Sequence, residues 1–341
     1  MLFDHTQVDT MISLSNEKFI FEEVHHSFGL LFLNFVKGGR TESLRATFRI
    51  NPREAISADG FTSFVENPDN FIEFSAALIS AMNAETRSVL EFRSPTDVSI
   101  ANKMLAFPAL GEKREGVWNL KLTNEFHMTN DSKLFHTAPA KNRLPLYEGR
   151  MIHQFVSEQV APKYWIEEPA GRASILGTRA KTAATEKLGY ESARFAFREI
   201  ARSTDARTLI ASMLPPRVFA NHKLMVGRPE TMDGPVALYV LGIVNAMTFD
   251  YLIRQQVASS ISMYAFYQMP VPRLTEADPK LKAISSRAAR LVCTSESFDV
   301  LARQCGIDSH KDGATSAAER AQLRAELDGL VAHLYGLDED E

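Results

Sequence analysis

The chain has 341 residues, a formal net charge of −4, 45% hydrophobic residues and 23% charged residues, which excludes a disordered or fibrous protein. At about 100–200 residues per domain, this length indicates two or three domains. Its two cysteines, Cys293 and Cys305, exclude a disulfide framework and indicate free thiols in a reducing compartment. No signal-peptide pattern is present, and Asn245 and Asp250 interrupt the longest apolar stretch, 237–253. We therefore expect a cytoplasmic protein without a membrane partner.

The charge is unevenly distributed along the chain. Residues 1–140 carry 13 Lys+Arg and 18 Asp+Glu, a net −5. Residues 141–230 carry 15 and 9, a net +6, and residues 231–341 carry 10 and 15, a net −5. A basic middle segment between acidic ones is typical of a protein in which one lobe meets phosphate while the others meet water or protein.

The first part of the chain predicts a sheet. We expect short strands over 8–16 and 19–24, and a continuous apolar strand over 28–36 that is buried on both faces. A turn at 37–40 then leads to an alternating strand over 43–50. Because residues 12–36 are too apolar to remain at a free sheet edge without association, we expect self-association or a partner that completes the sheet.

The next segment mixes helices, strands and loops. Apolar spacing predicts a helix over 72–82, and Pro95-Thr96-Asp97 predicts the start of another. Residues 116–122 alternate as a strand, and 130–132 form a turn.

A regular row of arginines lies in the basic segment. Arg194, Arg198 and Arg202 are spaced by four residues, and Arg207 follows a break at 203–205. As a helix, this spacing places three arginines in one stripe; as a strand, it places them on one face with two phenylalanines on the other. The turn residues of the break favour a hairpin whose second strand begins at Thr208. Both interpretations give a cationic face backed by aromatics, and a solvated face without a partner is the alternative.

The remainder of the chain predicts mainly helices. Asn245 lies on the apolar side of the first of them, as either a hydrogen-bonded core residue or a functional contact. Ser316 begins the last helix as a capping box, and Gly336 ends it. The expected helices cover 234–252, 281–292, 295–304 and 317–335, and a strand is expected over 260–269.

Several catalytic motifs are missing from the sequence. It contains no glycine-rich phosphate loop, no dinucleotide fingerprint, no CxxC or HxxxH metal pattern and no nucleophile elbow. The Asn-Pro pairs at 51–52 and 67–68 lack the following Pro-aromatic pair with which amino-methyltransferases hold a flipped base. We therefore expect no metal, no cofactor and no catalysis in this chain alone.

Six strings carry a resemblance to the C-terminal half of the large adenine-specific DNA methyltransferases of type IIG-like restriction–modification and phage-defence systems. They occur in the same order as in that family and extend over nearly the whole chain. The strings cover residues 19–39, 124–135, 144–155, 194–216, 267–274 and 324–337.

The resemblance implies an α+β (mixed α/β) fold with four parts. These are the closing strands of a methyltransferase-like α/β sheet over 1–60, a connector over 61–143, a target recognition domain over 144–273 and a C-terminal helical domain over 274–341. In the family, a methyltransferase domain that binds S-adenosylmethionine precedes this region. The implied function is therefore sequence-specific recognition of double-stranded DNA, which positions the target adenine for a catalytic domain supplied in cis or in trans.

The candidate DNA-binding residues follow from the chemistry of duplex recognition. Arginine and lysine contact phosphates and set the register, while Arg reads guanine and Asn reads adenine in the major groove. A protein-interaction scaffold of a phage-defence complex, without direct DNA reading, is the alternative function. The candidates are Arg194, Arg198, Arg202, Arg207, Lys223, Asn221, Arg150 and Lys181.

Overall fold

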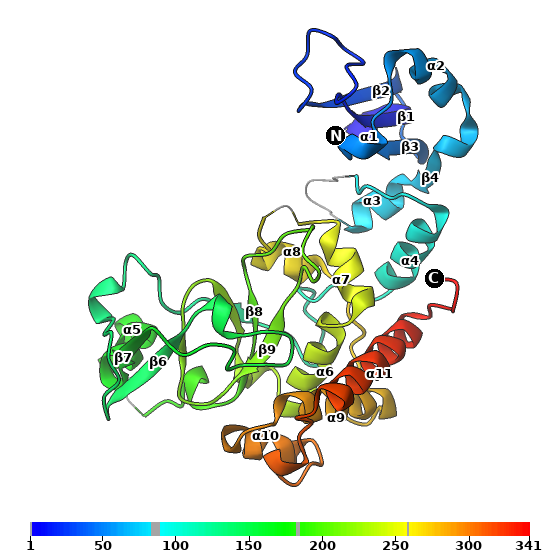
Figure 1. The fold of residues 1–341 in the computed structure, drawn as a ribbon. Helices are drawn as coiled ribbons and strands as arrows, with labels where there is room; N and C mark the ends of the chain where they lie inside the picture. The colour runs from blue at the N-terminus through cyan, green and yellow to red at the C-terminus, as the bar shows by residue number, and fades with distance from the viewer. Residues whose placement is uncertain (1, 83–88, 182–184, 258) are drawn as a thin grey trace. The chain divides into compact units, whose positions relative to one another are not determined.

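The computed structural model describes residues 2–82, 89–181, 185–257 and 259–341 (Figure 1). It has a mixed α/β architecture that divides into two compact units. The first comprises Met1–Ala106 with Glu339–Glu341, and the second comprises Phe107–Asp338. The division falls inside the segment 61–143, the expected connector.

The first unit is built on a four-stranded sheet of order β2-β1-β3-β4. β1 is antiparallel to β2 and parallel to β3, and β3 is antiparallel to β4. Gly38 and Gly39 turn the chain after β2 with φ of 91° and 75°, which glycine adopts without strain. Strands are confirmed at three of the expected places, but 19–24 forms turns and bends instead. The strands are β1 (Thr6–Ser15), β2 (Gly29–Lys37), β3 (Ser43–Arg49) and β4 (Ile72–Ser75).

β2 lies at the edge of this sheet and is largely exposed, so the expectation that it is buried on both faces is wrong. Leu31 is 64% exposed and Val36 is 63% exposed. Only part of one face is covered, where the Phe32 ring lies 5.9 Å from that of Phe21 and 5.3 Å from that of Phe61. An apolar sequence therefore reaches the surface because no strand pairs with the outer edge of β2 in the described part of the chain.

The described residues of the first unit form four α-helices. The expected helix over 72–82 is a strand followed by a short helix, because Ile72 and Phe74 pair with β3 before the chain turns. The start at Pro95 is confirmed, with a capping box between Ser94 and Asp97. The helices are α1 (Leu2–His5), α2 (Ala58–Glu66), α3 (Ala76–Met82) and α4 (Pro95–Leu105).

The second unit contains two small sheets, of order β10-β6-β7 and β5-β11-β8-β9. The expected arginine hairpin is confirmed as the antiparallel pair β8 and β9, but its second strand begins at Ala211 rather than Thr208. Of the strand expected over 116–122, only its last residue is in a strand. The strands are β5 (Leu122–Thr123), β6 (Arg143–Tyr147), β7 (Tyr164–Glu167), β8 (Arg194–Arg198), β9 (Ala211–Leu214), β10 (Phe219–Ala220) and β11 (Leu224–Gly227).

The helices of the second unit pack mainly around the buried α6, which contacts α9, α10 and α11 (Figure 1). The strand expected over 260–269 is wrong, because Ser262 caps a helix there by accepting from the Ala265 N–H. Gly336 ends the last helix in the left-handed conformation, with φ of 76°. The helices are α5 (Glu168–Leu176), α6 (Gly234–Val244), α7 (Met247–Arg254), α8 (Met263–Gln268), α9 (Pro279–Val292), α10 (Asp299–Gln304) and α11 (Ala317–Tyr335).

Asn245 breaks the expected long helix into α6 and α7. It is 3% exposed; its Oδ1 accepts from the Ala211 N–H at 3.2 Å and its Nδ2 donates to the Ala211 carbonyl at 3.0 Å. Asn245 is therefore a hydrogen-bonded core residue that ties the helices to β9. Among the described residues no single helix is long and apolar enough to cross a membrane; α6 and α7 reach that length and composition only together, bent by 65°.

Candidate nucleic-acid interface

Three of the candidate residues converge at the end of β8. Arg198 is the last residue of that strand and pairs with Leu224 of β11, directly after Lys223. A Cβ placed on Gly149 would lie 3.7 Å from Arg198 Cγ and 3.8 Å from the Lys223 carbonyl oxygen, which brings the turn of Arg150 to the same place. We call Arg150, Arg198 and Lys223 the basic cluster.

Arg198 is the half-buried centre of the basic cluster. Its Nη2 donates to the Ile152 carbonyl, while its Nε is buried and makes no hydrogen bond within the described residues. Burial lowers the pKa of its guanidinium, because desolvation disfavours the charged form.

Lys223 and Arg150 are held by ion pairs at the surface. Lys223 Nζ lies 2.9 Å from Glu199 Oε2, and Arg150 Nη2 lies 2.9 Å from Glu148 Oε2. Surface ion pairs contribute about 0–1 kcal/mol and are screened by salt. Both cations are more exposed than their carboxylates, with side-chain exposures of 40% for Lys223 and 57% for Arg150 against 22% for Glu199 and 19% for Glu148.

The pKa of His153 is affected by the charge of Arg198 in the basic cluster. Its pKa is lowered by burial first and then by the positive charges of Arg198 and Arg324. Both effects favour the neutral form of the imidazole.

The loop after β8 carries the next two candidates. Arg202 is exposed, and its carbonyl accepts from the Asp205 N–H at 3.2 Å and the Thr208 hydroxyl at 3.1 Å, which closes a turn. Arg207 lies 3.9 Å from Asp328 of α11. Arg202 thus presents its charge to solvent, whereas Arg207 has a carboxylate partner.

A clamp from α7 fixes this loop. Arg254 donates to the backbone carbonyls of the loop, and Asp250 Oδ2 accepts from Arg254 at 2.7 Å while its Oδ1 accepts from the Leu209 N–H at 2.7 Å. Sequence reasoning missed both residues, because the partners lie more than 40 positions apart and the only local signal is an i,i+4 ion pair. The three carbonyls that accept from Arg254 belong to Ser203, Asp205 and Ala206.

Arg194 does not belong to a cationic surface. It is 2% exposed and forms a bidentate pair with Glu125, with an Nη2–Oε2 distance of 3.1 Å, and it also donates to the Val218 carbonyl at 2.8 Å. Glu125 in turn accepts from the Ala220 N–H at 2.7 Å. The expected face of evenly spaced arginines is therefore interrupted, because the first of them is an internal cross-link between β8 and the segment before β10.

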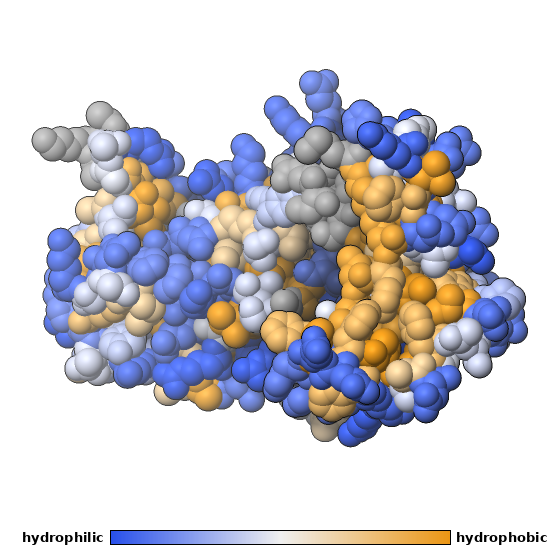
Figure 2. Space-filling model, turned by 90° about the horizontal axis from the view of Figure 1, so that it is seen from above, coloured by the Kyte–Doolittle hydropathy of each residue, from blue (hydrophilic) through white to orange (hydrophobic). Residues whose placement is uncertain are grey.

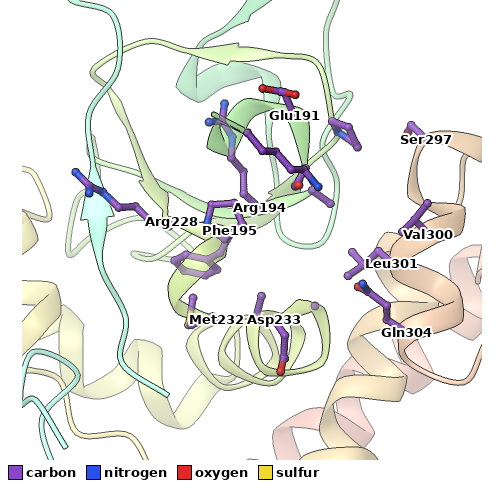
Figure 3. A pocket seen from close by; sticks show the side chains of 18 residues that line it. Glu191, Arg194, Phe195, Arg228, Met232, Asp233, Ser297, Val300, Leu301 and Gln304 are labelled. Atoms are coloured by element: carbon purple, nitrogen blue, oxygen red, sulfur yellow. The ribbon is translucent and has the colours of Figure 1, made fainter. Parts of the chain in front are cut away.

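Figure 3 shows the cavity that Arg194 lines at the other end of β8 from the basic cluster. The cavity has a volume of about 350 Å³ and lies between β8, the start of α6 and α10. Its apolar side chains include Phe195, Met232 and Leu301. Its place in the fold separates it from the candidate interface.

Two further candidates occupy other positions. Asn221 is 3% exposed, and its Oδ1 accepts from the Lys223 N–H at 3.1 Å, so it shapes the turn before β11 and does not face solvent as a base reader would. The side chain of Lys181 lies outside the described residues.

An imidazole stack beside Lys223 escaped the sequence analysis. The rings of His127 and His222 lie 4.2 Å apart at an angle of 21°, and Asn124 Nδ2 donates to the His222 carbonyl at 3.2 Å. Burial, followed by the charges of His127 and Lys223, lowers the pKa of His222. No local pattern could have paired these histidines. In the described residues no group of three or more His, Cys, Asp or Glu could hold a metal ion.

No protein-family model and no curated protein matches the chain. Among solved structures, it is similar to the type IIL restriction-modification enzyme MmeI in complex with DNA, with 10% identity and a TM-score of 0.41 over 98% of this chain and 44% of that one. It is similar to the HsdS subunit from Thermoanaerobacter tengcongensis, with 12% identity and a TM-score of 0.28 over 70% and 50% of the two chains. A chain of a type I restriction-modification system shows 12% identity and a TM-score of 0.30 over 83% and 64%. The chain spans less than two thirds of each of these three.

Proposed function

We propose that this chain is the DNA-recognition module of an adenine-specific DNA methyltransferase of the restriction–modification kind, acting in the cytoplasm. The observation that supports it is the convergence of Arg150, Arg198 and Lys223 at one end of β8, with exposed Arg202 in the following loop. These residues come from separate stretches of the one basic segment of the chain, so folding concentrates its charge.

In this proposal the basic cluster binds the phosphate backbone and sets the register of the duplex. Lys223 and Arg150 exchange their carboxylate partners for phosphate oxygens, and Arg202 adds a cation without such a partner in the described residues. Arginine at this surface can also read guanine by two parallel hydrogen bonds. A catalytic domain in cis or in trans supplies S-adenosylmethionine and acts on the adenine after it leaves the base stack.

The test uses alanine variants of Arg202 and Lys223, with Arg287→Ala as the matched control. Arg287 of α9 pairs with Glu326 of α11. It lies in the acidic segment 231–341, outside the basic segment. Loss of a phosphate contact reduces the slope of log affinity against log salt by about one unit. Fluorescence anisotropy with a duplex at two salt concentrations measures it.

Arg198→Ala is read separately, because Arg198 also bonds to Ile152 and its loss affects the fold. After a melting check, this variant is expected to weaken binding as well. A base-reading residue instead costs about 1–3 kcal/mol and relaxes the preference at one base pair. If every variant binds duplex DNA like the parent, the basic cluster is a solvated surface and the proposal fails.

The cofactor proposal has its own measurement. S-adenosylmethionine is expected to bind the complete enzyme and not this chain, because the chain contains no glycine-rich cofactor loop. Calorimetric titration of the chain with S-adenosylmethionine should give no heat of binding. Micromolar binding would contradict the assignment of this chain to recognition alone.

The second candidate function is a protein-interaction scaffold of a phage-defence complex. The exposed apolar residues of β2 favour it, because such residues mark protein contacts. Loss of partner binding without any change in DNA affinity in β2 variants would separate this role from recognition. A neighbouring gene that encodes a methyltransferase with the Asn-Pro-Pro-Tyr motif would favour the recognition module.

A further inference from the structure

Six exposed, large hydrophobic side chains of the described residues lie on one hairpin of the first unit. We call β1, β2 and the loop 16–28 between them the apolar hairpin. Figure 2 shows hydrophobic residues gathered on the surface of the first unit. The strongly exposed members are Phe19 (45%), Phe21 (46%), Phe28 (62%), Leu31 (64%), Phe35 (47%) and Val36 (63%).

β2 lacks the features by which natural edge strands avoid pairing. It is nine residues long, and from Gly29 to Val36 it contains no charged residue and no proline. Within the described residues, β1 is the one strand that pairs with β2, so no strand pairs with the outer edge of β2. A long, neutral edge of this kind is a template for another strand.

Charges of opposite sign stand at the two ends of β2. The loop 16–28 before it carries Glu17, Glu22, Glu23 and Lys18, a net −2, and both Glu22 and Glu23 are exposed. The turn 37–40 after it carries exposed Lys37 and Arg40, a net +2.

We propose that β2 pairs antiparallel with β2 of a second copy of this chain. Antiparallel pairing places the basic turn of each copy beside the acidic loop of the other, whereas parallel pairing would place like charges together at both ends. A partner with a different strand would not obtain this complementarity from its own sequence. The charge pattern of the strand ends therefore selects a second copy.

The side chains are compatible with this register. With Leu33 opposite its own copy, Leu31 faces Phe35 on the same side of the joined sheet, and Lys37 meets Gly29. The exposed Leu31 and Phe35 of both copies thereby cover one another. Because each copy uses the same surface, the assembly closes as a two-fold dimer.

This inference goes beyond the proposed function, since the apolar hairpin and the basic cluster lie in different units. Its first test is sedimentation velocity of the full chain over a range of concentrations, where a monomer–dimer equilibrium is expected. Leu31→Lys should weaken the dimer by about tenfold or more, because it buries an unpaired charge in the contact. Val300→Lys is the control, since Val300 is equally exposed, at 64%, but lies in α10.

A charge exchange tests the direction of pairing without touching the apolar residues. One variant carries Glu22→Lys and Glu23→Lys, and the other carries Lys37→Glu and Arg40→Glu. Each alone should dimerise about tenfold more weakly, because like charges then meet at both ends. Mixed together, the two variants should form a heterodimer as tight as the parent dimer.

Three outcomes would overturn the proposal. These are a parent chain that stays monomeric throughout, a Leu31→Lys variant that dimerises like Val300→Lys, and charge variants that dimerise normally alone. DNA affinity of the monomeric variants is measured in parallel. If these variants bind DNA as the parent does, the dimer and the DNA-binding proposal are independent, and either can fail without the other.

Discussion

β2 of the first unit and β8 of the second each contain two phenylalanines, but the two strands differ in burial. β2 is uncharged from Gly29 to Val36, yet most of it is exposed. β8 begins and ends with an arginine, yet four of its five residues are buried. The charged strand is in the interior, and the apolar strand is at the surface.

The difference follows from the neighbours of each strand. β8 lies between β9 and β11, and Glu125 reaches it from another segment to neutralise Arg194. β2 has one neighbour and lies at the edge. Position in a sheet and the presence of a counter-charge therefore decide burial here, more than the hydrophobicity of the strand itself.

The largest expected effect comes from breaking the internal ion pair of β8. Arg194→Ala leaves Glu125 buried without a cation, with side-chain exposures of 2% and 6% in the intact pair. Such a loss costs about 3–5 kcal/mol of unfolding free energy. Urea unfolding followed by circular dichroism measures it.

The matched control for that variant is Arg217→Ala. Arg217 also pairs with a glutamate, Glu168, at 2.7 Å, but its side chain is 60% exposed, so the expected cost is about 0–1 kcal/mol. The double variant Arg194→Met/Glu125→Gln should recover more than half of the lost stability, because no unpaired charge remains. Equal costs for the two alanine variants would mean that the charged strand is not interior.

The next largest loss of stability is expected from removing the Asn245 hydrogen bonds that join the helices to β9. Asn245→Ala leaves the N–H of buried Ala211 without its partner, which costs about 1–3 kcal/mol, whereas the Ala211 carbonyl still accepts from the Phe155 N–H at 3.2 Å. Asn130→Ala, at an exposed turn, should change stability by less than about 0.5 kcal/mol. Thermal melting compares the two variants. Equal stability would show that the Asn245 hydrogen bonds to Ala211 do not stabilise the fold.

A smaller effect is expected on the pH dependence of stability. The pKa of His153 is lowered in the folded chain by burial and by Arg198 and Arg324, so the unfolded chain takes up a proton first as the pH falls. The stabilisation is complete above the unfolded pKa of about 6.5 and is lost as the pH falls through it toward the folded value. His153→Asn should therefore melt with a shallower loss between about pH 7 and pH 5. Parallel melting profiles of parent and variant would contradict it.

The smallest expected effect belongs to β2. At concentrations where the chain is monomeric, Leu31→Ser should change the unfolding free energy by less than about 0.5 kcal/mol, because Leu31 is 64% exposed. Urea unfolding at low concentration tests it. A loss above about 1 kcal/mol would show that this face of β2 is covered within a single chain.

Local signals predicted the elements that depend on local chemistry. The helix start at Pro95, the helix end at Gly336 and the strands β1 and β3 were predicted, because each depends on neighbouring residues. The helix at 263–268 was missed, because its alternation of apolar residues concealed the cap at Ser262. The break at Asn245 depends on Ala211, which lies 34 positions away.

The candidate interface was predicted in its composition but not in its arrangement. The basic segment and the hairpin led to Arg198, which is half-buried at the end of β8, and to Arg202, which is exposed in the following loop. Arg194 has the same spacing and the same residue type, and only its distant partner Glu125 removes it from the surface. Glu125 lies 69 positions from Arg194, so the sequence around Arg194 does not indicate that this arginine is paired and buried.

The clamp of Arg254 on the loop that carries Arg202 has a kinetic consequence. The backbone of this loop is already ordered in the free chain, since three of its carbonyls accept from one guanidinium. The conformational entropy of ordering it is lost during folding and not when a ligand arrives. Association at this loop should therefore be limited by diffusional encounter, with a rate constant that rises as the salt concentration is lowered.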